Sequence, residues 1–246
     1  MDLPRLLTQA ENGDLAGALG ALPNPPGRAH RVGITGPPGA GKSTLTGALI
    51  RLWRSEGKTV AVVAVDPSSP RTGGALLGDR IRMESVALDP GVFIRSMATR
   101  GALGGLARGT RAVSDVLDAA GYDIVIVETV GVGQTELDVV SASDTTVLVL
   151  VPESGDGIQA LKSGLMEVAD IFAVNKADRP AANRMVGEIR AAIHLGARAD
   201  GRAGGQGPRW TPPVVATIAT SSQGIEELAR EIERHRGVRR ASAQAQ

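Results

Sequence analysis

Residues 33–44, GITGPPGAGKST, have the residue types and spacing of a loop that binds phosphate groups. The pattern G-x-x-x-x-G-K-[ST] is matched without departure. Glycines let backbone N–H groups turn toward phosphate oxygens, and a following helix N-terminus adds the positive end of its dipole. Lys42 is expected to contact the β- and γ-phosphates, and Ser43 to coordinate Mg²⁺. The predicted phosphate-binding residues are Gly36, Pro38, Gly39, Ala40, Gly41, Lys42, Ser43 and Thr44.

A second motif indicates which base the nucleotide carries. FAVNKAD at 172–178 places the pattern N-K-x-D directly after an apolar run. A carboxylate there can accept hydrogen bonds from both N1–H and the 2-amino group of guanine, and adenine offers no such pair of donors. The segment TSSQGIEEL at 220–228 would add contacts to the base, although its residues would also suit an N-cap. We therefore expect GTP or GDP to contact Asn175, Lys176, Asp178, Ser221, Ser222 and Gln223.

Three acidic residues are candidates for a metal site. Asp66 and Glu128 end apolar runs, and Asp79 lies in the segment LGDRIRM. Open α/β sheets bind ligands at the carboxyl ends of their strands. Mg²⁺ takes few direct carboxylates together with phosphate oxygens and water. We expect Ser43 and these acids to surround Mg²⁺, with some acids acting through water; a turn before Pro67 and a solvated loop charge are the alternatives for Asp66 and Asp79.

The segment ETVGVGQTE at 128–136 has the composition of a switch loop. A glycine N–H after the strand can contact a γ-phosphate and release it when that phosphate leaves. Gln134 could orient the attacking water, so the catalytic candidates are Lys42, Asp79, Glu128 and Gln134. Asp156 and Lys162 follow the next apolar run and could respond to the nucleotide, or serve as a helix cap and a surface lysine.

The segment 66–111 is rich in arginine and glycine and is too long for a simple connection. Long loops in compact domains are often functional. Its arginines, beginning with Arg71, could contact a partner or the nucleotide, or form a solvated face.

Short apolar runs alternate with helical spacing along the rest of the chain. Most of the runs are apolar throughout, which is typical of strands buried on both faces of a parallel sheet. We predict an α/β fold with a doubly wound, mostly parallel sheet and helices on both faces, the P-loop NTPase G domain. The predicted strands are 31–35, 59–65, 123–129, 145–151, 171–175 and 213–219, and helices are expected at 113–120, 157–168 and 225–232.

The length of 246 residues suits one α/β domain. We expect a short N-terminal helical segment and linker at 1–28, a GTPase domain at 29–236, a flexible insertion at 197–213 and a disordered tail at 237–246. Lys and Arg total 27 against 26 for Asp and Glu, which gives no indication of nucleic acid or a membrane surface as partner. The lack of cysteine, signal peptide and long apolar run makes the cytoplasm the default expectation.

The successive motifs resemble those of one GTPase family. GITGPPGAGKST, AVDPSSPRTGGALLGDRIRM, TRGALGGLARGTR, YDIVIVETVGVGQTE, ESGDGIQALKSG and AVNKAD are similar to the motifs of MeaB/ArgK-type GTPases, the methylmalonyl-CoA mutase-associated G proteins. The human methylmalonic aciduria type A protein belongs to this family. The likeness runs from about residue 29 to 180, with a looser correspondence to about 235.

The resemblance implies a GTP-hydrolysing chaperone for an adenosylcobalamin-dependent acyl-CoA mutase. Such proteins gate cofactor delivery and protect or reactivate the mutase, and switch loops couple them to the nucleotide. It also implies that Lys42 and Ser43 bind phosphate, that Asp66, Asp79 and Glu128 are the acids near Mg²⁺, and that Asp156 and Lys162 lie in a third switch. Family members usually carry a C-terminal extension that forms a dimer arm; we expect that a homodimer is possible but that the usual arm is absent.

Two other functions share parts of this pattern. Nickel-insertion GTPases have the same architecture, but they need Cys and His ligands, and this chain has no cysteine and scattered histidines. A kinase acting on arginine or a similar small molecule is the third hypothesis. N-K-x-D favours guanine over adenine and therefore argues against it.

Overall fold

The computed structural model describes residues 2–66, 84–98, 105–129, 139–152, 168–199 and 210–244. Within them, seven parallel strands form one sheet in the order β3-β2-β4-β1-β5-β6-β7. The predicted doubly wound parallel fold is confirmed. The strands are β1 His30–Thr35, β2 Val60–Asp66, β3 Val92–Ala98, β4 Ile124–Thr129, β5 Thr145–Leu150, β6 Ile171–Val174 and β7 Val214–Ala216.

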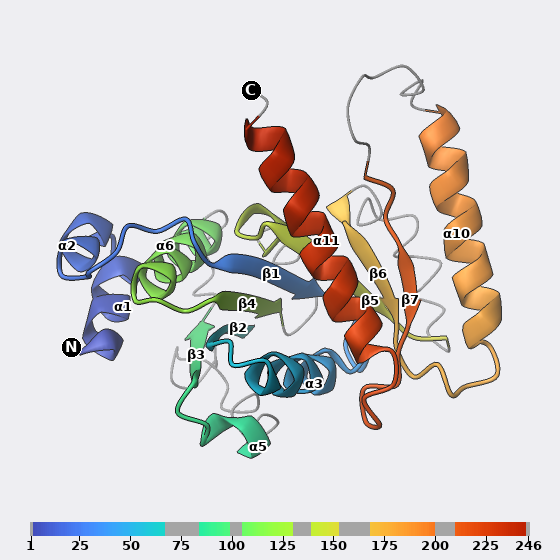
Figure 1. Cartoon of the computed structure of the whole chain (residues 1–246), viewed down its shortest axis with the longest axis horizontal. Coiled ribbons are helices and arrows are strands. Elements are labelled where there is room, and N and C mark those ends of the chain that lie inside the picture. The colour runs from blue at the N-terminus through green and yellow to red at the C-terminus, as the bar shows by residue number, and fades with distance from the viewer. Residues whose placement is uncertain are drawn as a thin grey trace.

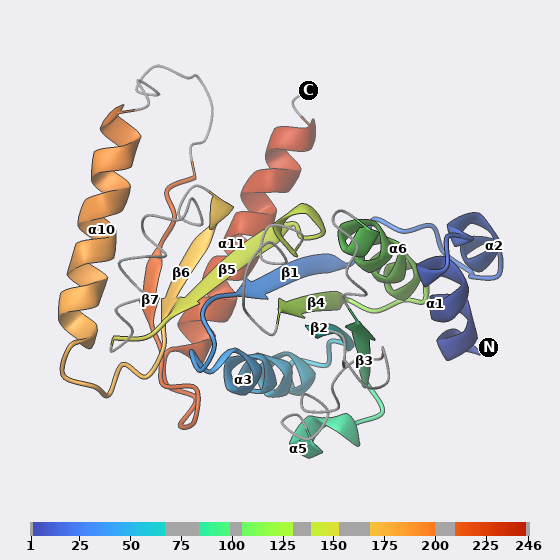
Figure 2. The same cartoon turned by 180° about the vertical axis from the view of Figure 1, so that it is seen from behind.

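Helices cover both faces of the sheet (Figures 1 and 2). On one face lie α3 and α11, and on the other lie α6 and α10, with α1 and α2 packed outside α6. The short α5 lies beside α3 and β3. The described helices are α1 Leu3–Glu11, α2 Leu15–Gly20, α3 Lys42–Ser55, α5 Glu84–Ala87, α6 Gly105–Ala119, α10 Ala182–Ala199 and α11 Ile225–Gln244.

Alternate residues along the strands contribute to the apolar cores on the two opposite faces of the sheet. Val60 and Val62 of β2 belong to the core under α3 and α11, whereas Ala61 and Val63 belong to the core under α6. Successive side chains of a strand point to opposite faces, so a strand covered on both sides must be apolar at every position. This explains why the central runs show no polar alternation in the sequence.

The N-terminal segment is anchored through one buried carboxylate. Asp118 of α6 accepts hydrogen bonds from the backbone N–H groups of Gly27 at 2.6 Å, Arg28 at 3.0 Å and Ala29 at 2.9 Å. These bonds satisfy donors that the proline-rich linker cannot pair within a helix or strand. These bonds therefore fix the position of the linker directly before β1.

Three details differ from the sequence expectation. The loop-like segment 66–111 contains α5, β3 and the beginning of α6. β3 was missed because it is an edge strand, half-buried and interrupted by Arg95, whose guanidinium pairs with Glu11 at 2.7 Å. The N-terminal stretch forms two helices instead of one, because Gly13 adopts φ +103° and the Asp14 carboxylate accepts from the N–H of Gly17.

The third difference is the tail from residue 237, where the expectation of disorder was wrong up to Gln244. α11 continues through it to that residue. Arginines on this part of the helix donate to backbone carbonyls near β1 and β5: Arg239 to Asp144 at 2.8 Å, and Arg240 to Arg28 at 3.4 Å. These tertiary contacts hold a segment whose composition alone favours disorder.

A buried polar chain connects α11 to the sheet at its amino edge. The Thr145 hydroxyl lies 2.8 Å from His30 Nε2 and 2.8 Å from His235 Nδ1, and His235 Nε2 lies 3.3 Å from Asp170. The Trp210 ring covers His235 at a centroid distance of 4.7 Å. Burial, followed by the charges of Arg236, His235, Arg240 and Arg239, lowers the pKa of His30 to about 3. His30 is therefore neutral in the folded protein near neutral pH.

Acid should destabilise the fold through His30. An unfolded histidine binds a proton below about pH 6.5, whereas folded His30 does so only near the lowered pKa. Its contribution to stability is therefore present above pH 6.5 and is lost as the pH falls from there toward about 3. Chemical denaturation should show the free energy of unfolding falling in this window, with His30 supplying up to about 1.4 kcal/mol per pH unit.

Replacing His30→Gln should flatten this pH dependence. His194→Gln is the matched control, since His194 is exposed on α10 and its removal should leave the wild-type slope. An unchanged slope in the His30 variant would contradict the assignment.

Candidate functional site

The loop between β1 and α3 has the shape that its glycines predict. Gly36, Gly39 and Gly41 have φ values of +139°, +75° and +87°. These left-handed conformations are accessible to glycine at little cost. At Gly36 a side chain is also excluded by space, because the carbonyl of Val149 in β5 occupies the place of a Cβ. The chain can thus turn sharply from the central strand into α3, whose N-terminus faces the loop.

Lys42 lies at the first position of α3 and its side chain folds back over this loop. Its ammonium donates to the carbonyls of Gly36 at 2.7 Å and Pro37 at 3.1 Å, and the residue is 7% exposed. A partly buried ammonium aimed at the loop is placed to contact phosphate oxygens. Charge-assisted hydrogen bonds to phosphate would then take the place of those to the carbonyls.

Glu128 reaches the same loop from β4. The register pairs Ile34 of β1 with Glu128, so the end of β4 lies beside the start of the loop. One carboxylate oxygen accepts from the Ser43 hydroxyl at 2.7 Å, and the other accepts from the Thr46 hydroxyl at 2.8 Å. Glu128 is 1% exposed. Because both hydroxyls come from α3, the carboxylate is fixed relative to the phosphate loop.

Ser43 and Glu128 are hard oxygen donors and therefore suit a cation such as Mg²⁺ better than nickel or zinc. Among the residues that the structure describes, no cluster of three or more His, Asp or Glu side chains forms a cage for a metal. Mg²⁺ is usually held by few protein ligands together with phosphate oxygens, and the Ser43 hydroxyl beside the Glu128 carboxylate supplies oxygen ligands of that kind. The residues present thus fit Mg²⁺ in the company of a nucleotide.

Asp66 ends β2 at the same sheet edge as Glu128, as expected. The placement of its side chain, however, is outside what the structure describes. Other predicted site residues also lie outside the described residues, and their roles stay predictions: Asp79, Gln134, Asp156, Lys162 and Arg71.

Asn175 joins the phosphate loop to the segment after β7. Its amide nitrogen donates to the carbonyl of Ala40 at 2.8 Å, and its amide oxygen accepts from Thr217 Oγ1 at 3.3 Å and Ala219 N at 3.2 Å. The residue is 2% exposed. Lys176, with φ +56°, donates its ammonium to the carbonyl of Gly39 at 2.8 Å. The N-K-x-D motif is thus bonded directly to the phosphate loop.

The predicted base contacts after β7 lie in a tight turn. Ile218 pairs with Gln223, and Ser222 adopts φ +60°. Gly224 cannot carry a side chain because the carbonyl of Ala216 occupies that space. Ser221, Ser222 and Gln223 are exposed in this turn, as is Asp178 after β6. The N–H of Ala177 donates to Thr217, so the two segments are held side by side.

A pocket of about 430 Å³ opens over the phosphate loop. It is lined by Pro38, Gly39, Gly41, Lys42, Ser43, Thr44, Glu128, Thr129 and Lys176. The structure therefore places most of the predicted phosphate-binding residues around one space, with Glu128 and Lys176 on its walls. Sequence reasoning missed Thr46 and Thr217, and the only available signal was that Thr46 lies three positions after Ser43 on one helix face.

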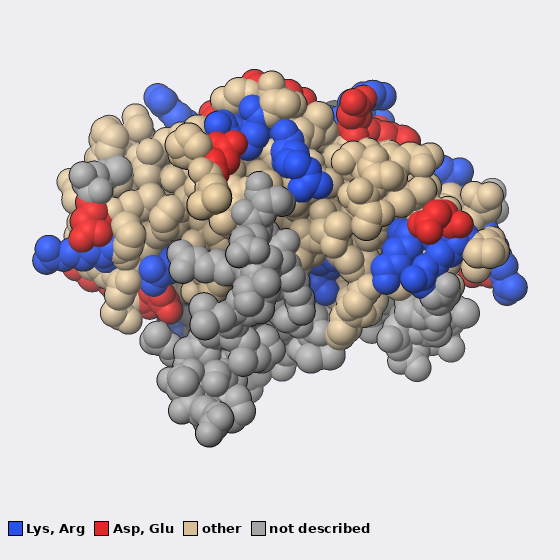
Figure 3. All heavy atoms as spheres, turned by 90° about the horizontal axis from the view of Figure 1, so that it is seen from below, with Lys and Arg blue, Asp and Glu red and all other residues tan. Residues whose placement is uncertain are grey.

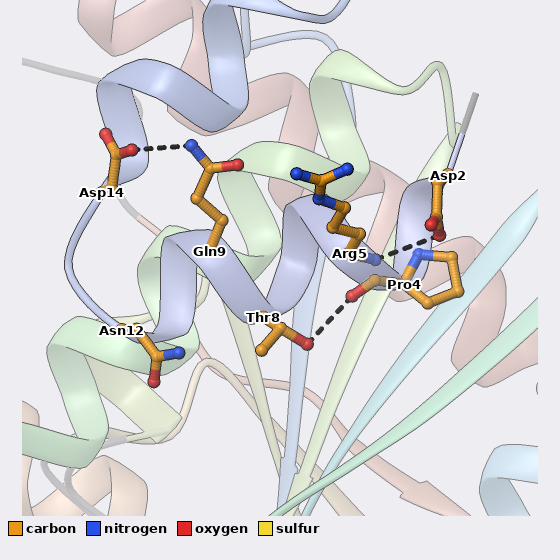
Figure 4. Close-up of a pocket in the computed structure, with 7 residues that line it drawn as sticks. All are labelled: Asp2, Pro4, Arg5, Thr8, Gln9, Asn12 and Asp14. Atoms are coloured by element: carbon orange, nitrogen blue, oxygen red, sulfur yellow. Dashed lines mark hydrogen bonds between the residues drawn. The ribbon is translucent and has the colours of Figure 1, made fainter.

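A second hollow lies along α1 and has a different character (Figure 4). Its polar groups are exposed and bond to neighbours, such as Gln9 to Asp14 at 2.6 Å and Thr8 to the carbonyl of Pro4 at 3.0 Å. On the face shown in Figure 3, basic and acidic side chains lie next to one another over the described surface. The described parts of the chain contain no helix with the length and apolar character needed to cross a membrane.

Comparison with known proteins identifies the family. Residues 3–246 match the protein family described as "Methylmalonyl Co-A mutase-associated GTPase MeaB". The chain belongs to the MeaB family. It is 57% identical over 210 residues to a Pyrococcus abyssi protein provisionally named a GTPase, covering 85% of this chain and 63% of that protein. It is also 42% identical over 207 residues to the GTPase ArgK of Escherichia coli, covering 82% of this chain and 60% of ArgK.

This MeaB-family chain therefore spans less than two thirds of the length of these relatives. Among solved structures, a LAO/AO transport system kinase is similar with a TM-score of 0.67 and 30% identity, over 98% of this chain and 76% of the other. HypB from Helicobacter pylori in complex with nickel has a TM-score of 0.56 at 16% identity, over 96% of each chain. The likeness to HypB shows a shared fold alone.

Replacing Lys42→Ala should abolish tight nucleotide binding without unfolding the protein. The ammonium donates to two carbonyls of the loop, and each lost charge-assisted bond to phosphate would cost about 1.5–3 kcal/mol. We expect affinity for guanine nucleotides, measured by calorimetry, to fall by roughly 100-fold or more. Lys58→Ala, at the opposite edge of the sheet, is the matched control and should bind normally. Wild-type affinity in the Lys42 variant would refute the assignment.

Proposed function

We propose that this protein binds GTP and GDP with Mg²⁺ and hydrolyses GTP as part of a chaperone cycle. One observation carries the proposal: Asn175 and Lys176 of the N-K-x-D motif donate to the carbonyls of Ala40 and Gly39 in the phosphate loop. A ligand that engages both motifs must carry a base and a phosphate chain at once. A nucleoside di- or triphosphate meets that requirement.

The choice of guanine rests on Asp178. Its carboxylate follows the buried end of β6 by a few residues and is exposed. Asn175 and Lys176 hold this segment against the phosphate loop, so the backbone at Asp178 is held close to that loop. Two hydrogen bonds from guanine to one carboxylate would then be formed without further ordering of the chain, and adenine would leave that carboxylate unpaired.

The described residues have separable tasks in hydrolysis. Lys42 binds phosphate oxygens, and the backbone N–H groups of the loop and of the α3 N-terminus orient the phosphate chain. Ser43 would present its hydroxyl oxygen to the cation, while the Glu128 carboxylate accepts a hydrogen bond from that hydroxyl. Bound Mg²⁺ would neutralise charge that develops on the β- and γ-phosphate oxygens. Gln134 is the proposed water-positioning residue, and Asp66 and Asp79 complete the proposed acid set.

Guanine selectivity is the first test of this function. Calorimetry with Mg²⁺ present should show GTP and GDP binding roughly 100-fold or more tightly than ATP, because ATP lacks the paired donors for Asp178. Asp178→Ala should remove most of this preference while leaving the phosphate loop intact. Equal affinity for ATP and GTP in the wild-type protein would overturn the assignment to guanine.

The partner is proposed from the family. MeaB is described as a methylmalonyl-CoA mutase-associated GTPase, and the chain is 40% identical over 201 residues to the mouse methylmalonic aciduria type A homolog, covering 80% of this chain and 47% of that protein. We infer that this chain assists an adenosylcobalamin-dependent acyl-CoA mutase by gating cofactor loading, protection or reactivation. Asp156, Lys162 and Arg71 are the proposed coupling residues.

Nickel insertion remains a second candidate on fold grounds, since HypB shares the architecture. The donor set argues against it: the chain has no cysteine, and the described His30 and His235 are buried in the polar chain at the amino edge. An arginine-type kinase is the other alternative, suggested by the LAO/AO transport system kinase. Its activity would need a phosphate acceptor site beside the loop.

A pull-down from the native host, with GTP, GDP or no nucleotide present, tests the partner. We expect recovery of a cobalamin-dependent mutase, in amounts that change with the nucleotide, because switch loops respond to the γ-phosphate. The Lys42→Ala variant is the control and should lose the nucleotide response. Recovery of a nickel enzyme instead would reverse the ranking of the two functions.

A further inference from the structure

Thr46 occupies a position that neither the phosphate-loop motif nor the N-K-x-D motif includes. It lies on α3 three residues after Ser43, so both side chains lie on one face of the helix. The Thr46 hydroxyl donates to one oxygen of Glu128 at 2.8 Å, and Ser43 donates to the other at 2.7 Å. Thr46 is fully buried and does not line the pocket over the phosphate loop.

The arrangement divides the two carboxylate oxygens between two hydroxyls. A carboxylate that is 1% exposed cannot replace a lost donor with bulk water, so it would turn toward its remaining donors. One of these is the Ser43 hydroxyl, at 2.7 Å. Any rotation of Glu128 changes the direction in which the Ser43 hydroxyl points its proton, and therefore the direction of its lone pairs.

We propose that Thr46 is a positioning residue that sets the affinity of the site for Mg²⁺ by holding the Glu128 carboxylate. It does not line the pocket over the phosphate loop and would act on the cation through Glu128 and Ser43. Groups that orient metal ligands typically contribute a factor of roughly 10–100 to metal affinity. This inference rests on the proposed Mg²⁺-dependent binding of guanine nucleotides and assigns the metal dependence of that binding to a residue outside both motifs.

The test compares GDP affinity in Mg²⁺ with GDP affinity in EDTA. Thr46→Val replaces the hydroxyl with a methyl group of similar size. We expect the affinity in EDTA to stay as in the wild type and the gain due to Mg²⁺ to shrink by roughly 10- to 100-fold. Thr46→Ser keeps the hydroxyl and should restore the wild-type gain. Thr46→Ala, which adds no atoms to the core, provides a second variant without the hydroxyl if valine prevents folding.

Thr110→Val is the matched control. Thr110 is also a buried threonine on a helix, but its hydroxyl has no hydrogen-bond partner among the described residues. Its replacement should leave both GDP affinities unchanged. Thermal unfolding of each variant shows whether a loss of GDP affinity is accompanied by a loss of overall protein stability.

The outcomes separate the two levels of the proposal. A Thr46→Val protein that loses GDP affinity equally in Mg²⁺ and EDTA, or keeps the full Mg²⁺ gain, overturns the positioning role and leaves the proposed function standing. A wild-type protein whose GDP affinity is the same in Mg²⁺ and EDTA overturns the metal-dependent function, and the role of Thr46 with it.

Discussion

The amide of Asn175 is the interaction on which the arrangement of the site depends. Its nitrogen bonds to Ala40 in the phosphate loop, and its oxygen accepts from Thr217 and Ala219 after β7. A buried amide has donors and acceptors to satisfy on both sides, and leaving one of them unpaired costs about 1–3 kcal/mol. The bonds therefore tie three loops, which are remote from one another in the sequence, into one rigid corner. The phosphate loop and the N-K-x-D segment cannot move apart without breaking them.

The opposite wall of the site depends on a buried charge. Glu128 is almost fully enclosed, and burying an ionised carboxylate is unfavourable unless donors compensate it. The hydroxyls of Ser43 and Thr46 provide compensation from one helix. The site thus places a carboxylate beside the phosphate loop, where a bound cation would add a favourable charge interaction and would also offset the repulsion between the carboxylate and phosphate groups. The two hydroxyls that compensate the buried carboxylate thus also hold it where a cation would bind.

The two edges of the sheet have different roles. At the carboxyl edge, strand ends and glycine turns leave backbone groups facing a pocket. At the amino edge, hydrogen bonds made by Asp118, by the histidine and threonine chain and by Arg239 of α11 anchor the N-terminal linker and the last helix to the sheet. Parallel strands bring all loops of one kind to one edge, so binding and anchoring can be separated in this way.

Local patterns in the sequence predicted the fold class, the phosphate loop and the N-K-x-D segment, and the fold class is confirmed. Each depends on residues close together in the chain: glycines followed by Lys42, apolar runs of strand length, and Asn175 with Asp178. Only the tertiary structure decided that Thr46 holds Glu128, that Asn175 grips Ala40, that β3 adds an edge strand, and that α11 reaches Gln244. These features join segments that lie far apart in the sequence, and a pattern along the chain contains no information on the distance between such segments.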